Sequence, residues 1–185
     1  MKNLDPLQLY TDMLRIRFVE ETISQEYSKQ EMRCPVHLSI GQEAIPVGVS
    51  SRLTINDQIV SAHRSHAHYL AKGCDLKKMI SELFGKVDGC CRGKGGSMHL
   101  FDLEAGQIAA VPIVGSSIPI GTGVALGLKR QKKPGIVVIY LGEGATEEGV
   151  FSESLDFAKL QNLPVLFVCE NNLYSVYTPL GSRQD

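Results

Sequence analysis

The chain has 185 residues, 43% of them hydrophobic and 21% charged, and its formal net charge is −1. This size and composition are typical of a globular domain with a real core, and the balanced charge argues against a nucleic-acid-binding protein, which normally has a basic face. No apolar run approaches the roughly 20 residues that a membrane-spanning helix requires, so we expect no membrane association.

The N-terminal half is predicted to be mainly helical. Asp5-Pro6 is typical of a helix start, and apolar residues at helical spacing extend this helix over about residues 6–29. Three further elements are expected in this half: a helix after Gly41, a short strand over Gln58–Ala62 and a helix over Leu76–Phe84 that Asp75 caps.

Residues 85–97 are expected to form a loop, because they hold five glycines and little apolar material. A structureless segment of this length is uncommon in a compact domain, which favours a functional loop. No linker divides the chain. We therefore expect residues 1–185 to form a single, incomplete domain, with residues 1–40 as an N-terminal helical arm.

From Ile118 onward the pattern predicts a parallel sheet. The expected elements are a small-residue helix over Ile118–Arg130, a strand over Gly135–Leu141, a turn over Gly142–Ala145, a helix over Glu147–Gln161 and a strand over Pro164–Cys169. Both strands are continuously apolar, as in sheets that are covered on both faces. The predicted fold is therefore α/β, with a parallel sheet and helices on both faces.

The five cysteines favour a reducing compartment. Their number is odd, and no C-x-x-C pair occurs, so we expect neither a disulfide framework nor a zinc site. The first residues also lack the apolar core of a signal peptide. We expect a cytoplasmic protein.

Polar residues follow both predicted strands of the C-terminal half. Glu143 comes directly after the first strand and Asn172 follows the second. Parallel strands lie about 5 Å apart and end at the same edge, so these side chains could meet there. Carboxylate and amide oxygens suit Mg²⁺, which prefers a few protein oxygens together with phosphate. Gly142 and Gly144 would let the backbone approach such a phosphate closely.

Two other phosphate-binding motifs do not fit. Only three residues separate Gly89 from Gly93, and Gly95 rather than Ser or Thr follows Lys94, so this loop is not a Walker A motif. Glu147 stands where a dinucleotide fingerprint needs its third glycine.

Five motifs, in order, carry a resemblance to a known family. They are His37-Leu38-Ser39-Ile40-Gly41-Gln42-Glu43-Ala44, His63-Arg64-Ser65-His66, the G-K-G-G-S-M-H loop of Gly93–His99, Ile113-Val114-Gly115, and G-E-G-A-x-x-E-G from Gly142 followed by Asn171-Asn172. Together they resemble the alpha subunits of thiamine-diphosphate-dependent 2-oxo-acid dehydrogenases. Glu143 stands where most members have aspartate, and His63 stands where tyrosine is usual.

The resemblance implies a thiamine-diphosphate-binding fold and assigns roles to individual residues. Metal ligands would be Glu143, the Asn172 side chain and the Tyr174 carbonyl, all for Mg²⁺. Further cofactor contacts would come from His63 and Arg64, from the Val114 backbone, and from Gly144 and Ala145 against the diphosphate. The substrate approach would be lined by the catalytic candidates His37, His66 and His99. Two alternatives stay open at this stage: each of these histidines could instead order a loop through hydrogen bonds, and Arg64 could be a solvated surface residue.

The resemblance also implies an activity. The chain would decarboxylate a 2-oxo acid such as pyruvate and pass the acyl unit to a lipoyl-bearing acyltransferase (E2). Its site would be shared with a beta subunit in an α₂β₂ heterotetramer, so the chain alone would bind cofactor weakly and turn over nothing. The alternatives are an acetoin dehydrogenase or carboligase subunit, and a catalytically silent interaction subunit. Family alpha subunits are far longer, so we expect a C-terminal truncation that exposes apolar sheet surface.

Overall fold

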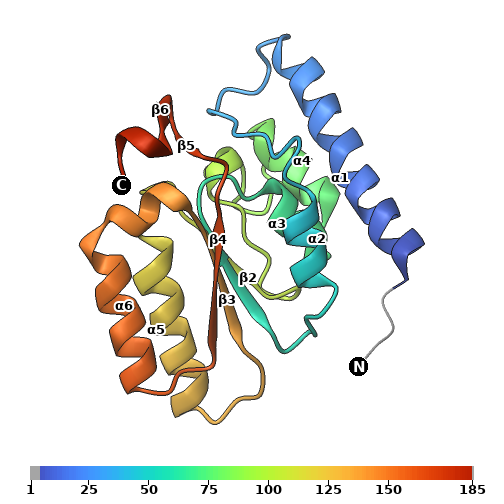
Figure 1. Ribbon diagram of the computed structural model, residues 1–185. Helices are drawn as coiled ribbons and strands as arrows, with labels where there is room; N and C mark the ends of the chain where they lie inside the picture. The colour runs from blue at the N-terminus through green and yellow to red at the C-terminus, as the bar shows by residue number, and fades with distance from the viewer. Residues whose placement is uncertain (1–4, 185) are drawn as a thin grey trace. The chain divides into compact units, whose positions relative to one another are not determined.

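A computed structural model describes residues 5–184, which fall into two compact units (Figure 1). Unit 1 comprises the described residues up to Ile55 together with His63–Ala110. Unit 2 comprises Asn56–Ala62 and the described residues from Val111 onward. The expectation of a single domain with a helical arm over residues 1–40 stays a prediction, and residues 1–4 of that arm lie outside the described part of the chain.

Unit 1 begins with the long helix that the sequence predicts. Helix α1 (Pro6–Tyr27) is capped by Asp5, whose Oδ1 accepts a hydrogen bond from the Leu7 N–H at 3.0 Å. The helix ends two residues before the predicted boundary. Its apolar residues include Ile16 and Ile23, which are buried and belong to the hydrophobic core of the unit.

The rest of unit 1 consists of short elements. They are α2 (Ala44–Ser50), α3 (His66–Ala71), α4 (Leu76–Leu83), the 3₁₀ turn η1 (Gly96–Met98) and strand β2 (Gln107–Ala110). Helices α2 and α4 were predicted, and Asp75 caps α4 by accepting from the N–H groups of Lys77 and Lys78. Helix α3 and strand β2 were not predicted.

Unit 2 contains the predicted parallel sheet. Its strands β1 (Gln58–Ser61), β3 (Val137–Gly142) and β4 (Val165–Glu170) are all parallel, and β3 lies between the other two. Strand β3 is buried along nearly its whole length, as its continuous apolar run indicates. The prediction of a parallel α/β sheet is therefore confirmed.

The two helices of unit 2 lie on the same side of this sheet (Figure 1). Helix α5 (Ser117–Arg130) contacts all three strands, and α6 (Gly149–Leu160) packs against α5 (Figure 1). A side chain at Gly121 would clash with Ile139 of β3, so the small residues of α5 allow the helix to approach the sheet closely. The unit also contains the turn η2 (Glu143–Glu147), the hairpin of β5 (Tyr174–Ser175) and β6 (Thr178–Pro179), and the turn η3 (Leu180–Ser182).

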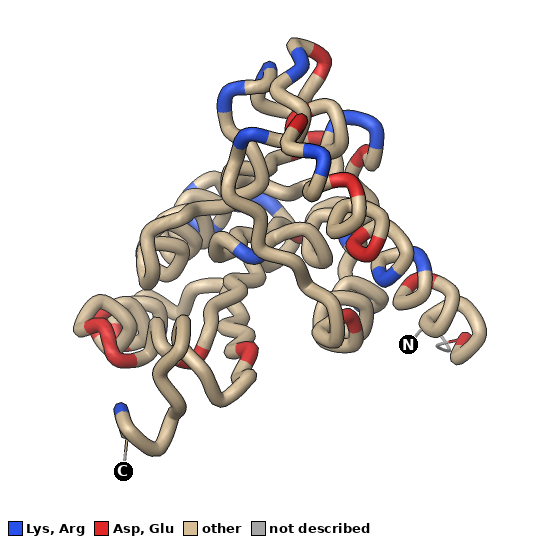
Figure 2. Tube along the Cα trace, turned by 90° about the horizontal axis from the view of Figure 1, so that it is seen from above, with Lys and Arg blue, Asp and Glu red and all other residues tan. Residues whose placement is uncertain are grey.

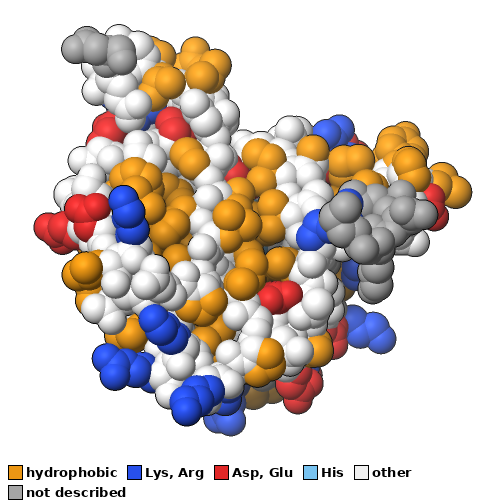
Figure 3. Space-filling model, turned by 60° about the horizontal axis from the view of Figure 1, so that its bottom comes forward, with side chains coloured by type: hydrophobic (Ala, Val, Ile, Leu, Met, Phe, Trp, Pro, Cys, Tyr) orange, Lys and Arg blue, Asp and Glu red, His pale blue; other side chains and the backbone are white. Residues whose placement is uncertain are grey.

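Several hydrophobic side chains reach the surface (Figure 3). Leu166 on strand β4 is 45% exposed. Charged residues of both signs are distributed along the chain (Figure 2). Among the described residues, no helix is both long enough and apolar enough to span a membrane.

Candidate functional site

Strands β3 and β4 end side by side, as the sequence predicts. Gly142 at the end of β3 is in register with Glu170 at the end of β4. The chain then continues from β3 into η2, which begins with Glu143, and from β4 into the loop that holds Asn172. Turn η2 contacts β5, so these two segments lie together at the carboxyl edge of the sheet.

Glu143 is buried at this edge and is paired with a cation. Arg183 donates from Nη2 to Glu143 Oε1 at 2.6 Å and from Nη1 to Glu147 Oε1. Gln184 also donates to Glu147, at 3.0 Å. A buried carboxylate needs such a positive partner, because an uncompensated charge is costly away from water. Arg183 therefore compensates the buried charge of Glu143. Sequence reasoning missed Arg183, which lies outside every motif.

Asn172 orders the turn after β4. Its Oδ1 accepts from the Tyr174 N–H at 3.0 Å, just as Asn171 Oδ1 accepts from the Leu173 N–H at 2.9 Å. Leu173 has a φ of 69°, and the turn leads into the β5–β6 hairpin that Tyr174 begins. An amide oxygen has two lone pairs, so this N–H bond leaves Asn172 able to bind a metal ion as well.

Gly144 is closely packed against side chains of the site. A Cβ at this position would lie 2.7 Å from Ser175 Oγ and 3.3 Å from Arg183 Nη1. A Cβ at Gly142, in contrast, would meet no atom within 4 Å. Ala145 is buried, and the Thr146 hydroxyl donates to the Glu143 carbonyl at 2.6 Å, which fixes the turn. Val114, the other predicted cofactor contact of unit 2, is half-exposed and lies three residues before the start of α5.

In unit 1, His37, His63 and Arg64 are brought together. The two imidazole rings meet edge to face, with their centroids 4.7 Å apart. Burial, and then the Arg64 charge, lowers the pKa of His37; burial, followed by His37 and Arg64, lowers the pKa of His63. Arg64 donates from Nη1 to the Leu38 carbonyl, and His37 Nδ1 is buried without a hydrogen-bond partner. The Arg64 guanidinium gives this cluster a positive charge, which suits an anion.

His66 is fully enclosed in unit 1. Its Nδ1 lies 2.7 Å from Glu20 Oε1, and its Nε2 lies 2.7 Å from Ser97 Oγ. Glu20 also accepts from the Ser39 N–H at 2.5 Å. Both ring nitrogens are engaged, which supports the loop-ordering alternative for His66 over a substrate contact. Sequence reasoning missed Glu20 and Ser97 as its partners.

The glycine-rich loop is held by another residue that the sequence did not single out. Glu82 of α4 is buried, and its carboxylate accepts from four backbone N–H groups, those of Cys91, Gly93, Gly95 and Gly96. Burial alone would raise the pKa of Glu82, but these four donors lower it overall. His99, at the end of this loop, is exposed, and its Nδ1 lies 2.7 Å from the Gly95 carbonyl. That contact leaves Nε2 for another partner.

Comparisons with known proteins agree with these motifs. The sequence matches the family described as Dehydrogenase E1 component over residues 11–184. It is 44% identical over 173 residues to the alpha subunit of acetoin:2,6-dichlorophenolindophenol oxidoreductase of Bacillus subtilis (strain 168), covering 94% of this chain and 52% of the relative. It is 42% identical over 176 residues to pyruvate dehydrogenase E1 component subunit alpha-3, chloroplastic, of Arabidopsis thaliana. The alignment covers 92% of this chain and 41% of that relative.

A third relative is the pyruvate dehydrogenase E1 component subunit alpha of Rickettsia bellii (strain RML369-C), which is 40% identical over 175 residues with 95% and 54% covered. The chain spans about half the length of these curated relatives. The family match includes every candidate site residue described above. The chain therefore belongs to the dehydrogenase E1 component family.

Proposed function

We propose that this chain is part of the alpha subunit of a thiamine-diphosphate- and Mg²⁺-dependent 2-oxo-acid dehydrogenase. The substrate is a 2-oxo acid such as pyruvate, and the acyl unit passes to a lipoyl-bearing acyltransferase. A beta subunit completes the site in an α₂β₂ assembly, so turnover requires both chains. The names of the relatives from Arabidopsis thaliana and Rickettsia bellii support a pyruvate dehydrogenase.

The buried Glu143 carboxylate is the observation that carries this proposal. It lies at the carboxyl end of β3, where ligands bind in open α/β sheets, and it is already paired with a cation. Together with the Asn172 side chain and the Tyr174 carbonyl it offers hard oxygen donors, which fit Mg²⁺. Gly144 and Ala145, which lie on the same turn as Glu143, are assigned to the diphosphate.

The remaining candidates bind and orient rather than carry out the bond-breaking chemistry. Thiamine diphosphate, when bound, supplies the nucleophilic carbon for decarboxylation. Arg64 and His63 are assigned to the diphosphate, and the Val114 backbone to the cofactor ring. His37 and His99 are assigned to the substrate approach, and His66 holds the loop that carries His99. The cytoplasmic location also stays a prediction.

The test is a calorimetric titration of thiamine diphosphate into the purified chain, with Mg²⁺ and then with EDTA. Glu143→Ala should abolish the Mg²⁺-dependent heat, whereas Glu143→Asp, which introduces the residue usual in the family, should retain it. Glu153→Ala is the matched control, because Glu153 is an exposed carboxylate on α6. Binding that is indifferent to both EDTA and Glu143→Ala would overturn the proposed metal site.

A second candidate function is acetoin cleavage. Two relatives, from Bacillus subtilis and Cupriavidus necator, are named as alpha subunits of acetoin:2,6-dichlorophenolindophenol oxidoreductase, at 44% and 42% identity. The chain with its beta partner should be offered acetoin and pyruvate separately, with dichlorophenolindophenol as the electron acceptor. Faster dye reduction with acetoin would favour this candidate. No turnover of either, despite cofactor binding, would favour the silent interaction subunit.

A further inference from the structure

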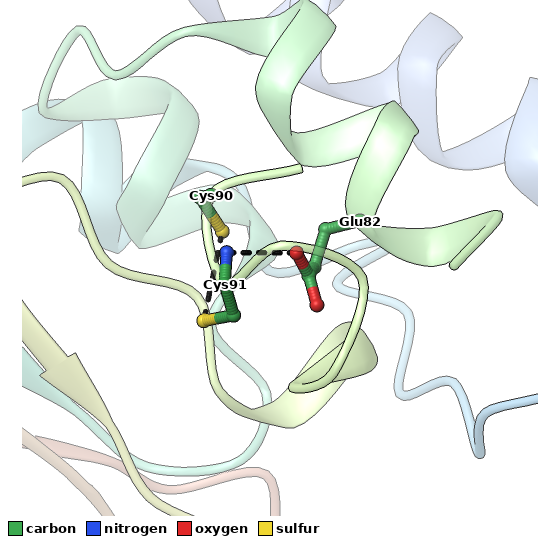
Figure 4. Close-up of side chains that lie close together, drawn as sticks. All are labelled: Glu82, Cys90 and Cys91. Atoms are coloured by element: carbon green, nitrogen blue, oxygen red, sulfur yellow. Dashed lines mark hydrogen bonds between the residues drawn. The ribbon is translucent and has the colours of Figure 1, made fainter. Parts of the chain in front are cut away.

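The loop after α4 places two thiols side by side. Cys90 and Cys91 are adjacent in sequence and half-buried, and their Sγ atoms are 4.0 Å apart (Figure 4). The Cys91 thiol also donates to the His99 carbonyl at 2.8 Å. Neither cysteine has a role in the proposed function, and all five cysteines of the chain are free.

Glu82 lies next to this pair, but it is not available as a metal ligand. The ligand atoms of Glu82, Cys90 and Cys91 all lie within 4.8 Å of one another. However, each carboxylate oxygen of Glu82 already accepts two backbone N–H groups, and a carboxylate has about four lone-pair positions. The site therefore offers two sulfur ligands and a nearby negative charge, which is too few ligands for a tetrahedral metal ion.

A disulfide between the two cysteines is also disfavoured. Adjacent Cα atoms are about 3.8 Å apart, below the roughly 4.4–6.8 Å that disulfides usually span. The peptide between them is held as well, because the Cys91 N–H donates to Glu82 Oε2 at 2.7 Å. A single atom that bridges both sulfurs needs no S–S bond and leaves this peptide in place.

We propose that Cys90 and Cys91 form a dithiol site that captures a trivalent arsenical, with one arsenic atom bound to both sulfurs. One molecule of R–As(OH)₂ reacts with the two cysteine thiols to give R–As(S–Cys)₂ and two water molecules. Two As–S bonds form, two As–O and two S–H bonds break, and the thiol protons leave in the water. Arsenic stays trivalent, so the step needs no oxidant or reductant.

Charge also favours this class of ligand. Burial, together with the neighbouring thiol and Glu82, raises the pKa of Cys91 to about 12, and burial raises that of Cys90. Both thiols are therefore protonated near neutral pH. A ligand that reacts with neutral thiols and gives a neutral product places no new negative charge beside Glu82. Its binding removes the S–H that donates to the His99 carbonyl, and so it alters the end of the glycine-rich loop.

The probe is phenylarsine oxide, whose hydrate has two exchangeable hydroxyl groups. Intact-mass analysis of the purified chain should show one phenylarsenic adduct, removed by excess 2,3-dimercaptopropanol and resistant to the same concentration of a monothiol. Cys90→Ser and Cys91→Ser should each abolish the adduct, and Cys169→Ser, the matched control at an exposed cysteine of β4, should retain it. An adduct that survives both single variants would overturn the proposal.

The unmodified chain provides an independent readout. After treatment with phenylarsine oxide, the protein is unfolded without reductant, alkylated and mapped by mass spectrometry. Cys90 and Cys91 should be protected together, and Cys34, Cys74 and Cys169 should be alkylated in full. Protection of a different pair, or of one cysteine alone, would contradict the site even if a serine variant failed to fold.

Discussion

Arg183 and Glu143 form an ion pair at the carboxyl edge of the sheet, with 2.6 Å between Nη2 and Oε1. Their side chains are only 11% and 7% exposed, so water screens this pair weakly. Glu143 is also the carboxylate that we assign to Mg²⁺. The guanidinium already bonds Oε1 of this carboxylate, so we expect it to compete with the metal ion for Glu143.

Arg183→Ala should strengthen Mg²⁺ binding and lower the stability of the metal-free protein to unfolding. Removing one partner of a buried pair leaves an uncompensated charge, which costs about 3 kcal/mol or more. Mg²⁺ should then restore much of that loss, so thermal unfolding of the variant should respond to Mg²⁺ more strongly than wild type. Gln184→Ala is the control, since Gln184 bonds Glu147 and Thr146 but not Glu143. An equal Mg²⁺ response in both variants would rule out competition.

Gly144→Ala should destabilise the edge of the site, whereas Gly142→Ala should be tolerated. The added methyl at 144 would meet Ser175 Oγ at 2.7 Å, and overpacking of this kind typically costs about 1–3 kcal/mol. The methyl at 142 would enter open space, and the φ of −79° suits alanine. Urea unfolding and cofactor titration of both variants test this. Equal behaviour of the two would show that the packing around residue 144 does not require glycine.

The C-terminal sheet could be predicted from the sequence because its signals are local. The apolar runs of β3 and β4 and the small residues of α5 each identify an element without reference to the rest of the chain. Helix α3 was missed because His66 and His68 are buried in it, and a hydrophobicity pattern counts histidine as polar. The tertiary hydrogen bonds of His66 to Glu20 and Ser97, which no local pattern contains, accommodate its ring in the interior.

The same distinction separates the candidate residues that were found from those that were missed. Motifs identify Glu143 and Asn172 because the spacing between these residues is set by a single strand–helix–strand unit. Glu20 and Ser97 are 46 and 31 residues from His66, and Arg183 is 40 residues from Glu143. No spacing rule joins such pairs, so only the folded chain reveals that they are partners.

Glu82→Gln should remove a pH-dependent part of the stability. Four N–H donors lower the pKa of Glu82 in the folded state, against the effect of burial. The contribution of Glu82 to the free energy of unfolding is therefore fully present above its pKa in the unfolded chain, near about 4.3. It is lost as the pH falls through the lower pKa of the folded state. Glutamine keeps the shape of the side chain but carries no charge. Its NH₂ group would also face backbone N–H groups, from which it cannot accept a hydrogen bond.

Urea unfolding at a series of pH values measures this effect. At pH 7, Glu82→Gln should be about 1.5–3 kcal/mol less stable than wild type, since a hydrogen bond to a charged group contributes this much. The difference should shrink in acid. Glu104→Gln is the control at an exposed carboxylate of the same unit. A difference that is constant down to pH 3 would show that the Glu82 charge is not what holds the loop.

His63→Tyr should flatten the pH dependence of diphosphate binding. Burial, His37 and Arg64 lower the pKa of His63, so this ring is neutral at pH 7 before the anion binds. A bound diphosphate favours the protonated ring, and wild-type affinity should rise several-fold between pH 8 and pH 6, up to about tenfold per unit for one proton taken up. Tyrosine, with a pKa near 10, does not titrate in this range. Calorimetric titration of thiamine diphosphate at each pH compares the two proteins with the same ligand, which cancels the ligand's own protonation. If the affinity for thiamine diphosphate changes with pH equally in wild type and in His63→Tyr, His63 does not contact the diphosphate.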